Sequence, residues 1–233
     1  MEAVILAGGK GTRLRPYTSD MPKALVPVGH RPVVEILLRQ LRKAGVTKAR
    51  LAVGHMAHLI EAALGNGSRL DLEISYSREE QPLSTIGPLK LLSDLPDDFL
   101  VINADILSDI DIDELFRNHL ESGAGLTVAV HRRYETIDYG VLESDGDNRA
   151  VSFAEKPQYS FLVSMGIYVV SRAVLDLVPQ GQPFGFDALM RLLLQREEKI
   201  NTYSYDGYWL DIGRPADYDQ AQADVELIES WLK

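Results

Sequence analysis

A stretch near the start of the chain combines glycines with cationic side chains. The segment "AGGKGTRLRP" (7–16) follows a short apolar run, and "PKALVPVG" (22–29) comes soon after it. Glycines leave backbone N–H groups free to approach an anion, and a loop that leads into a helix presents several of these groups together. Lys23 lies between two prolines, so its backbone is stiff. Together the two segments predict a phosphate-binding site.

This loop matches neither of two widespread phosphate-binding motifs. Lys10 follows Gly9 as in a Walker A loop, but valine stands at position 4 and glycine at position 11. The dinucleotide-binding fingerprint fails as well, because leucine occupies position 14. Solvated charges on a flexible turn would explain the composition, but the rigid Pro-Lys pair favours a triphosphate site. Four cations within 14 residues face a single acid, Asp20: Lys10, Arg13, Arg15 and Lys23.

The bulk composition narrows the class of protein. The chain has 233 residues, 45% of them hydrophobic and 25% charged, as in ordinary soluble domains. Its net charge of -10 argues against nonspecific binding of nucleic acid or of an anionic membrane, so an anionic ligand must meet a local basic patch. The absence of cysteine excludes disulfides, thiolate zinc sites and cysteine nucleophiles. The five histidines show no HExxH spacing.

Targeting signals are absent from the sequence. No run of 18 apolar residues occurs, and the apolar run at the start is too short for a signal peptide. We therefore expect a cytoplasmic protein with no membrane partner.

The first half of the chain alternates between predicted strands and helices. Helices are expected at 32–44, 55–64, 86–92 and about 111–121, and strands at 3–7, 49–54, 72–77 and 98–103. This alternation with short links predicts an α/β fold with a doubly wound, mostly parallel, Rossmann-like sheet flanked by helices. Ligands of such sheets bind beyond the carboxyl ends of the strands. Both the glycine-rich loop and the acidic turn "NADILSD" (103–109) follow strands there.

From residue 124 the pattern changes to strands in quick succession. They are expected at 125–133, 139–144, 150–157, 161–170, 200–205 and 207–213, with helices at 171–177, 185–197 and from about 215. No linker or internal repeat separates the halves. We expect a single α/β domain over 1–233, with a mixed extension of its sheet.

The segment "AVILAGGKGTRLRPYTSDMPKALVPVG" (3–29) resembles the signature of the sugar-nucleotide pyrophosphorylases, the nucleoside-triphosphate:sugar-1-phosphate nucleotidyltransferases. Further family segments follow in the same order along nearly the whole chain: "EEQPLSTIGPL", "FLVINADIL", "YGVLES", "FAEKP", "SMGIYVV" and "GYWLDIGRPADY". The chain is most similar to the mannose-1-phosphate guanylyltransferase branch. The resemblance implies the nucleotide-diphospho-sugar transferase fold, with a nucleotide-binding part at about 1–123 and a sugar-phosphate-binding part at about 124–233. The chain ends soon after "WLDIG", so the β-helix domain of longer relatives is not expected.

The implied reaction is attack by a sugar-1-phosphate oxygen on the α-phosphorus of a nucleoside triphosphate, which releases pyrophosphate and forms an NDP-sugar. Catalysis of this type consists mainly of positioning and charge neutralisation. By resemblance, the catalytic residues are Arg13 at the β- and γ-phosphates, Lys23 near the transferred group, and Lys156 of "EKP" at the sugar phosphate. Asp105 and Asp211 are the candidate ligands of Mg²⁺, the hard cation that bridges phosphates.

The remaining site residues are also assigned by resemblance. Glu155, Gly140, Ser164 and Gly166 are expected in the sugar pocket with Lys156. The nucleotide-binding set comprises Leu6, Ala7, Gly8, Gly9, Gly11, Thr12, Arg13, Lys23, Gln81, Thr85, Gly87, Asn103 and Asp105.

Three departures from the family pattern leave the substrates open. Gln81 stands where guanylyltransferases often carry glutamate. This difference weakens the case for guanine as the bound base and favours uracil or thymine. Ala104 replaces a common glycine beside the ribose, and Ser164 replaces a common asparagine in the sugar pocket. A pyrimidine-specific enzyme and a non-catalytic regulatory subunit that binds sugar nucleotides therefore remain as alternatives. The phosphate and metal residues are all present, which disfavours the regulatory subunit. The oligomeric state is left open as well, and a homo-oligomer is one of the alternatives.

Overall fold

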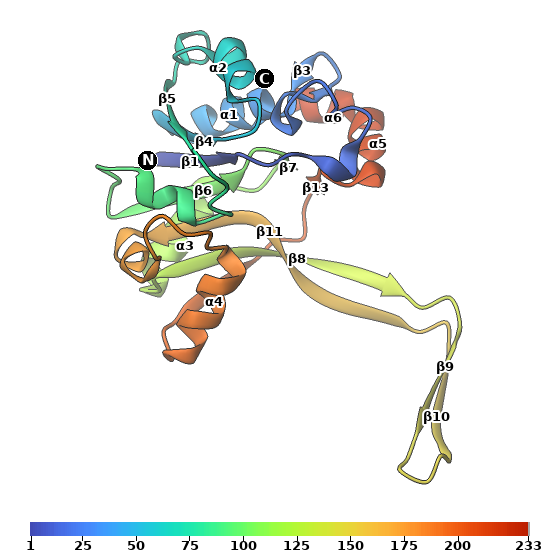
Figure 1. Cartoon of the computed structure of the whole chain (residues 1–233). Helices are drawn as coiled ribbons and strands as arrows, with labels where there is room; N and C mark the ends of the chain where they lie inside the picture. Colours follow the sequence, from blue (N-terminus) through green and yellow to red (C-terminus); the bar gives the residue numbers. More distant parts are fainter. Residues whose placement is uncertain (233) are drawn as a thin grey trace.

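A seven-stranded mixed sheet forms the centre of the computed structural model, which describes residues 1–232 (Figure 1). Its strand order is β12-β8-β11-β6-β1-β4-β5. The strands β6, β1, β4 and β5 run parallel, whereas β11 is antiparallel to both β6 and β8. The bounds are β1 Glu2–Ala7, β4 Lys48–Val53, β5 Glu73–Arg78, β6 Asp98–Asn103, β8 Leu126–Thr136, β11 Gln158–Ser171 and β12 Ile200–Ser204. The mixed α/β sheet expected from the sequence is confirmed.

Six α-helices and five short 3₁₀ helices flank the sheet within the described residues. The α-helices are α1 Val33–Lys43, α2 Ala57–Leu64, α3 Ile112–Ser122, α4 Phe186–Gln195, α5 Pro215–Ala223 and α6 Val225–Ser230. The 3₁₀ helices are η1 Thr12–Leu14, η2 Lys23–Leu25, η3 Ser68–Leu70, η4 Gly87–Leu91 and η5 Arg172–Leu177. The helices expected at 86–92 and 171–177 are thus 3₁₀ segments. No helix in residues 1–232 combines the length and the hydropathy that crossing a membrane requires.

The apolar core lies on both faces of the sheet, which explains the uninterrupted apolar run of β1. Ile5 packs in a cluster that includes side chains of α1, α2 and α3. Val4, the preceding residue, points to the other face and packs with side chains of η4, η5 and α4. A strand buried on both faces needs apolar residues at successive positions. A third cluster joins α5 and α6 to the outer side of α1.

Short strand pairs bring distant segments together at the carboxyl ends of β1 and β6. The strand β7 (Ile106–Ser108) follows β6 and pairs antiparallel with β13 (Trp209–Asp211), with Asp211 opposite Ile106. The N–H of Ile212 also donates to the carbonyl of Asp105 at 3.0 Å. This pairing places residues 103–105 beside 211–213. Another short pair, β2 (Pro27–Val28) and β3 (Arg31–Pro32), follows η2.

The strands β8 and β11 continue beyond the sheet as a two-stranded ribbon. The ribbon leads into a hairpin of β9 (Gly140–Ser144) and β10 (Ala150–Glu155), which projects far from the helices in Figure 1. We call residues 131–164, the ribbon together with its hairpin, the arm. Its strands were expected from the sequence, but its separation from the rest of the chain was not.

Candidate active site

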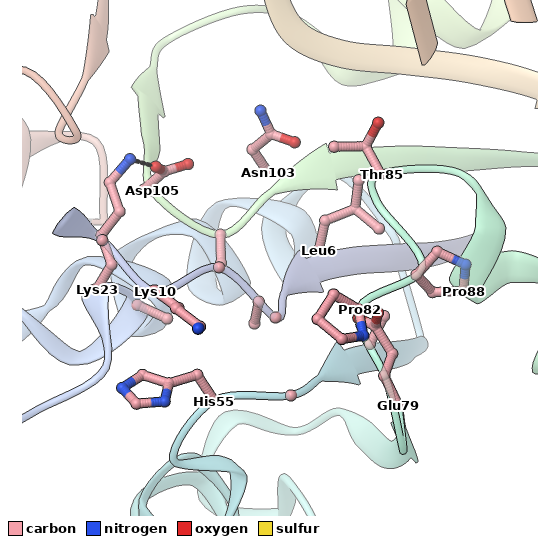
Figure 2. Close-up of a pocket in the computed structure, with 18 of the residues that line it drawn as sticks. Leu6, Lys10, Lys23, His55, Glu79, Pro82, Thr85, Pro88, Asn103 and Asp105 are labelled. Carbon is pink, nitrogen blue, oxygen red and sulfur yellow. Dashed lines mark ion pairs between the residues drawn. The ribbon is translucent and has the colours of Figure 1, made fainter. Parts of the chain in front are cut away.

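A cleft of about 770 Å³ opens at the carboxyl ends of the central parallel strands (Figure 2). Its walls come from the glycine-rich loop after β1, the turn after β4, the segment after β5 and the acidic turn after β6. Lys23 and Gly213 complete the lining from the two ends of the chain. This volume suits a ligand the size of a nucleotide, and the position is the one expected for the ligand of an open α/β sheet.

Nearly all of the residues predicted to bind nucleotide line this cleft. They are Leu6, Ala7, Gly8, Gly9, Gly11, Thr12, Arg13, Lys23, Gln81, Thr85, Asn103 and Asp105. Gly87 does not line it. It is buried at the start of η4, where a Cβ would lie 3.0 Å from Cβ of Leu83 and 3.1 Å from the carbonyl of Gln182. Gly87 therefore shapes the wall behind Thr85.

Local contacts hold the glycine-rich loop in place. Gly11 has a φ of 61°, which favours glycine, and its carbonyl accepts a hydrogen bond of 2.7 Å from the hydroxyl of Thr18. Leu14 is buried and anchors the short helix η1. At Gly8 a Cβ would come within 2.6 Å of Oε1 of Glu79, so any larger residue has to displace that carboxylate. The loop combines an anchored backbone with exposed cations.

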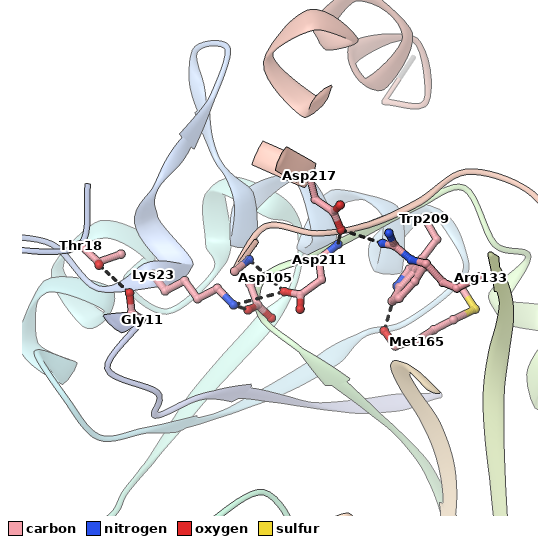
Figure 3. A network of polar contacts seen from close by, with 10 residues as sticks. Gly11, Thr18, Lys23, Asp105, Arg133, Met165, Trp209, Asp211 and Asp217 are labelled. Atoms are coloured by element: carbon pink, nitrogen blue, oxygen red, sulfur yellow. Dashed lines mark hydrogen bonds and ion pairs between the residues drawn. The ribbon is translucent and has the colours of Figure 1, made fainter. Parts of the chain in front are cut away.

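Lys23 lies between two carboxylates that are far apart in the sequence (Figure 3). Its ammonium forms ion pairs with Asp105 and with Asp211, the second at 3.3 Å. All three side chains are largely shielded from solvent, with exposed fractions of 14%, 14% and 24%. Burial lowers the pKa of Lys23, and the charge of Arg13 adds to this effect, whereas Asp211 raises it. The two predicted metal ligands therefore converge on one predicted catalytic lysine.

Backbone contacts fix the position of Asp211. Its carboxylate accepts a hydrogen bond of 2.9 Å from the N–H of Gly213, and its own N–H donates to Asp217 at 3.0 Å. Gly213 is buried beside Lys23, and a Cβ there would overlap the lysine ammonium and lie 2.9 Å from Oδ1 of Asp211. A larger residue at position 213 would have to displace the ammonium from its place between the two carboxylates.

A smaller cleft of about 280 Å³ adjoins the first and shares Asn103 with it. Of the residues predicted at the sugar or the metal, Ser164, Gly166 and Asp211 line it. The register of β11 shifts after Ser164, and Gly166 in this bulge has a φ of 74°. A Cβ on Gly166 would lie 2.5 Å from Nδ2 of Asn103. The bulge thus places two small residues next to the asparagine that both clefts share.

Several lining residues were not predicted from the sequence. In the smaller cleft, the guanidinium of Arg133 lies 4.9 Å from the centre of the Trp209 ring and donates to Asp217 at 2.9 Å. Trp209 in turn donates to the carbonyl of Met165 at 3.0 Å (Figure 3). Arg214 adds a second cation. The larger cleft also contains His55, Glu79, Glu80 and Ser84, beside Lys10 of the predicted basic patch. In the sequence, only the alternation of side chains along β8 could have indicated that Arg133 lies on the face that lines the smaller cleft.

Three residues predicted at the sugar lie elsewhere. Gly140, Glu155 and Lys156 belong to the exposed hairpin and its junction with the ribbon, and none lines either cleft of the described chain. The ammonium of Lys156 pairs with Asp138 at 2.6 Å, and its side chain is 58% exposed. Within one chain the structure does not bring Lys156 to Arg13.

The fold and the paired clefts define an α/β protein with a ligand site at the carboxyl ends of its central strands. The profile of the nucleotidyl transferase family matches residues 2–227, and the chain belongs to this family. It is 36% identical over 226 residues to the mannose-1-phosphate guanylyltransferase catalytic subunit beta of Danio rerio, which covers 94% of this chain. The mannose-1-phosphate guanylyltransferase of Mycobacterium tuberculosis is 34% identical over 234 residues, or 97% of this chain. The chain spans 62% and 64% of the lengths of these two relatives.

Solved structures agree with this assignment. HddC from Yersinia pseudotuberculosis has a TM-score of 0.76 at 27% identity, with 96% of this chain and 99% of that chain covered. A second structure of HddC, in complex with GMP-PN, has a TM-score of 0.73 at 25% identity, with the same coverage of 96% and 99%. A putative glucose-1-phosphate thymidylyltransferase from Bacillus anthracis has a TM-score of 0.75 at 24% identity, over 96% of this chain and 94% of that chain. This last likeness supports the fold alone.

Gly213→Ala tests the packing around Lys23. The added methyl group must displace the ammonium, and a displacement of this size lowers kcat by about 10²-fold when the group acts in the reaction. Steady-state kinetics and thermal melting of the variant give the two readouts. We expect kcat to fall while the melting temperature changes little. Gly146→Ala is the control, since a Cβ there meets nothing within 4 Å. An unchanged kcat in Gly213→Ala would mean that Lys23 takes no part in the catalysed reaction.

Proposed function

We propose that this chain transfers a nucleotidyl group from a nucleoside triphosphate to a sugar-1-phosphate, with release of pyrophosphate. The observation that carries the proposal is the convergence of Asp105 and Asp211 on Lys23, where the larger cleft adjoins the smaller one. A triphosphate in the larger cleft and a sugar phosphate in the smaller one would meet beside these three side chains. Such reactants are cytoplasmic metabolites, so the proposal includes a cytoplasmic location.

The cations of the two clefts have separate tasks in this proposal. Arg13, at the glycine-rich loop, contacts the β- and γ-phosphates, where its planar fork can bind two oxygens at once. Lys23 neutralises charge on the α-phosphate, the group that is transferred. Arg133 and Arg214 in the smaller cleft offer positive charge to the sugar phosphate. No side chain of the protein has to act as a nucleophile, because the sugar phosphate itself attacks.

The acidic pair fits a magnesium ion. Residues 1–232 contain no group of three or more His, Cys, Asp or Glu side chains that could hold a metal ion by themselves. Asp105 and Asp211 nevertheless face one common cation, so their oxygens lie close to each other. Mg²⁺ usually takes one or two protein carboxylates and completes its shell with phosphate oxygens and water. When bound, it would neutralise charge on the phosphates.

Guanine is the base that we propose, with mannose-1-phosphate or a related sugar phosphate as the acceptor. Guanine presents two adjacent N–H donors, which one carboxylate can accept. Glu79 lines the larger cleft, whereas Gln81 directs its amide N–H towards the carbonyl of Gly181 at 3.3 Å. Glu79 can therefore supply the carboxylate that Gln81 lacks. The guanylyltransferase relatives and the GMP-PN complex of HddC support this choice.

A pyrimidine enzyme is the second candidate. It is favoured by Gln81, which lines the cleft and can both donate to and accept from uracil or thymine. Pyrophosphate release from a panel of triphosphates and sugar-1-phosphates with Mg²⁺ distinguishes the two. Release only with guanine nucleotides supports the first candidate, and release only with UTP or dTTP supports the second. A protein that binds nucleotide but releases pyrophosphate with no pair of substrates would be the non-catalytic subunit.

Asp211→Asn should lower the rate of pyrophosphate release by about 10²–10³, the usual cost of one strong electrostatic contact in a transition state. Asparagine keeps the size of the side chain but loses the charge. The matched control is Asp219→Asn on the exposed side of α5, which should retain wild-type activity. Full Mg²⁺-dependent activity in Asp211→Asn would remove Asp211 from the site.

Glu79→Gln tests how the base is read. The glutamine can still accept the hydrogen bond of 2.7 Å that the N–H of Leu83 donates, but it cannot accept from both guanine donors. A lost hydrogen bond to a charged group is worth about 1.5–3 kcal/mol, so we expect KM for GTP to rise roughly 10-fold to 100-fold. KM for the sugar phosphate should stay unchanged, and an equal rise in both constants would contradict this role.

The pH dependence of GTP binding gives an independent test. Burial raises the pKa of Glu79 above that of an ordinary glutamate. A protonated carboxyl group loses half of its acceptor capacity, so KM for GTP should increase as the pH falls through this raised pKa. The increase should begin at a higher pH than the titration of an exposed glutamate, near 4.3. Kinetics of the wild type and Glu79→Gln between mildly acidic and neutral pH test this, because the dependence should vanish in the variant.

A further inference from the structure

The arm has two unpaired strand edges. The pairing of β12 with β8 ends at Val130, and the pairing of β6 with β11 covers only residues 167–171. Between 131–136 and 158–163 each strand therefore has only the other as its neighbour in the described chain. An isolated two-stranded ribbon is at best marginally stable in water, and long free edges are templates for further strands.

The arm also exposes most of the large apolar side chains on the surface. Nine of the fifteen that are exposed in residues 1–232 belong to it: Tyr134, Ile137, Tyr139, Leu142, Val151, Phe153, Tyr159, Phe161 and Leu162. Exposed apolar area that is this concentrated is typical of a surface that another molecule covers.

Both faces of the ribbon contribute to this apolar surface. The register places Phe161 opposite Arg133, on the face that lines the smaller cleft. Leu162 lies opposite Arg132, on the other face, and is 52% exposed. Since Phe161 and Leu162 are both about half exposed on opposite faces, folding the arm back onto its own sheet would still leave one of them in water.

We propose that two copies of this chain form a dimer in which their ribbons pair antiparallel, so that the junction of ribbon and hairpin in each arm, where Lys156 lies, reaches the smaller cleft of the other copy. This inference rests on the proposed function, because it assigns Lys156 to the sugar phosphate of the partner's site. A strand edge that pairs with its own copy antiparallel is self-complementary, as a two-fold interface requires. The arm carries six acidic and four basic residues interspersed along its length, which suits such a contact better than an anionic membrane surface.

The length of the ribbon explains why Lys156 would act in the other copy. Lys156 lies eight residues along the chain from Ser164, the residue of the smaller cleft at the base of the arm. At about 3.3 Å per residue this separation is roughly 26 Å, and even Phe161, the lining residue of β11 that is nearest along the chain, is roughly 16 Å away, beyond the reach of a lysine side chain. An antiparallel pair of ribbons brings the ribbon–hairpin junction of one arm to the base of the other arm. The smaller cleft lies at that base, lined by Arg133, Glu135 and Phe161.

Complementation between two inactive variants tests this arrangement. We would co-express full-length Lys156→Ala with Asp211→Asn and isolate the mixed protein through two different tags. In a mixed dimer, one site combines an intact Asp211 with an intact Lys156 from the other copy, and the second site has neither. Random pairing should therefore restore about a quarter of wild-type pyrophosphate release before purification, and isolated mixed dimers should reach about half.

The result that overturns the inference differs from the one that overturns the function. If the wild type is active but the mixed dimers are no more active than the two variants alone, each site is built from one chain and the inference fails. If the wild type releases no pyrophosphate with any substrate pair, the proposed function fails, and molecular mass then decides whether the arms pair.

Molecular mass in solution tests the interface without activity. Light scattering of the wild type should give twice the 25.9 kDa of the chain. Leu162→Asp, and independently Tyr134→Asp, should yield single chains with unchanged circular dichroism. Leu120→Asp on α3 is the matched control, since Leu120 is 55% exposed but lies outside the arm, and this variant should remain dimeric. A monomeric wild type at micromolar concentration, or a dimer that survives both arm substitutions, would overturn the inference.

Discussion

The ion pairs of Lys23 with Asp105 and Asp211 are the interactions on which the site depends. They join residues that are up to 188 positions apart in the sequence. A buried ammonium is costly in free energy unless opposite charges surround it, and burial does lower the pKa of Lys23. The short pair of β7 and β13 places Asp211 beside the ammonium. The absence of a side chain at Gly213 leaves space for it there. A triphosphate with its cation would then enter a site whose charges are already arranged.

Much of the fold could be predicted from local pattern. The apolar run of β1, buried on both faces, and the glycine that ends it already indicate a central strand followed by a ligand loop. The rule that ligands bind at the carboxyl ends of parallel strands then places the loop beside the acidic turn. Asp111 was expected near a helix start, and its side chain does accept from the N–H of Glu114 at 2.9 Å. These features depend on neighbours within a few residues.

Features that depend on distant contacts could not be predicted in this way. Arg133 belongs to the smaller cleft because the guanidinium reaches Asp217 and Trp209, which are brought near only by the complete fold. The alternating residues of the arm resemble an ordinary half-buried strand, and nothing in their order indicates that no other strand lies beside them. The position of Lys156 likewise follows from the direction of the arm, which the family resemblance does not specify. Sequence alone thus indicates the residue types of the site but not how many chains build it.

A double-mutant cycle on kcat/KM with Asp105→Asn and Asp211→Asn tests most directly whether the two carboxylates act as one unit around Lys23 and a divalent ion. Residues that act together show strongly non-additive losses. The account predicts that the double variant loses little more activity than the more damaging single variant. If the two losses multiply, the carboxylates act independently, and the shared charge centre proposed for this site is wrong.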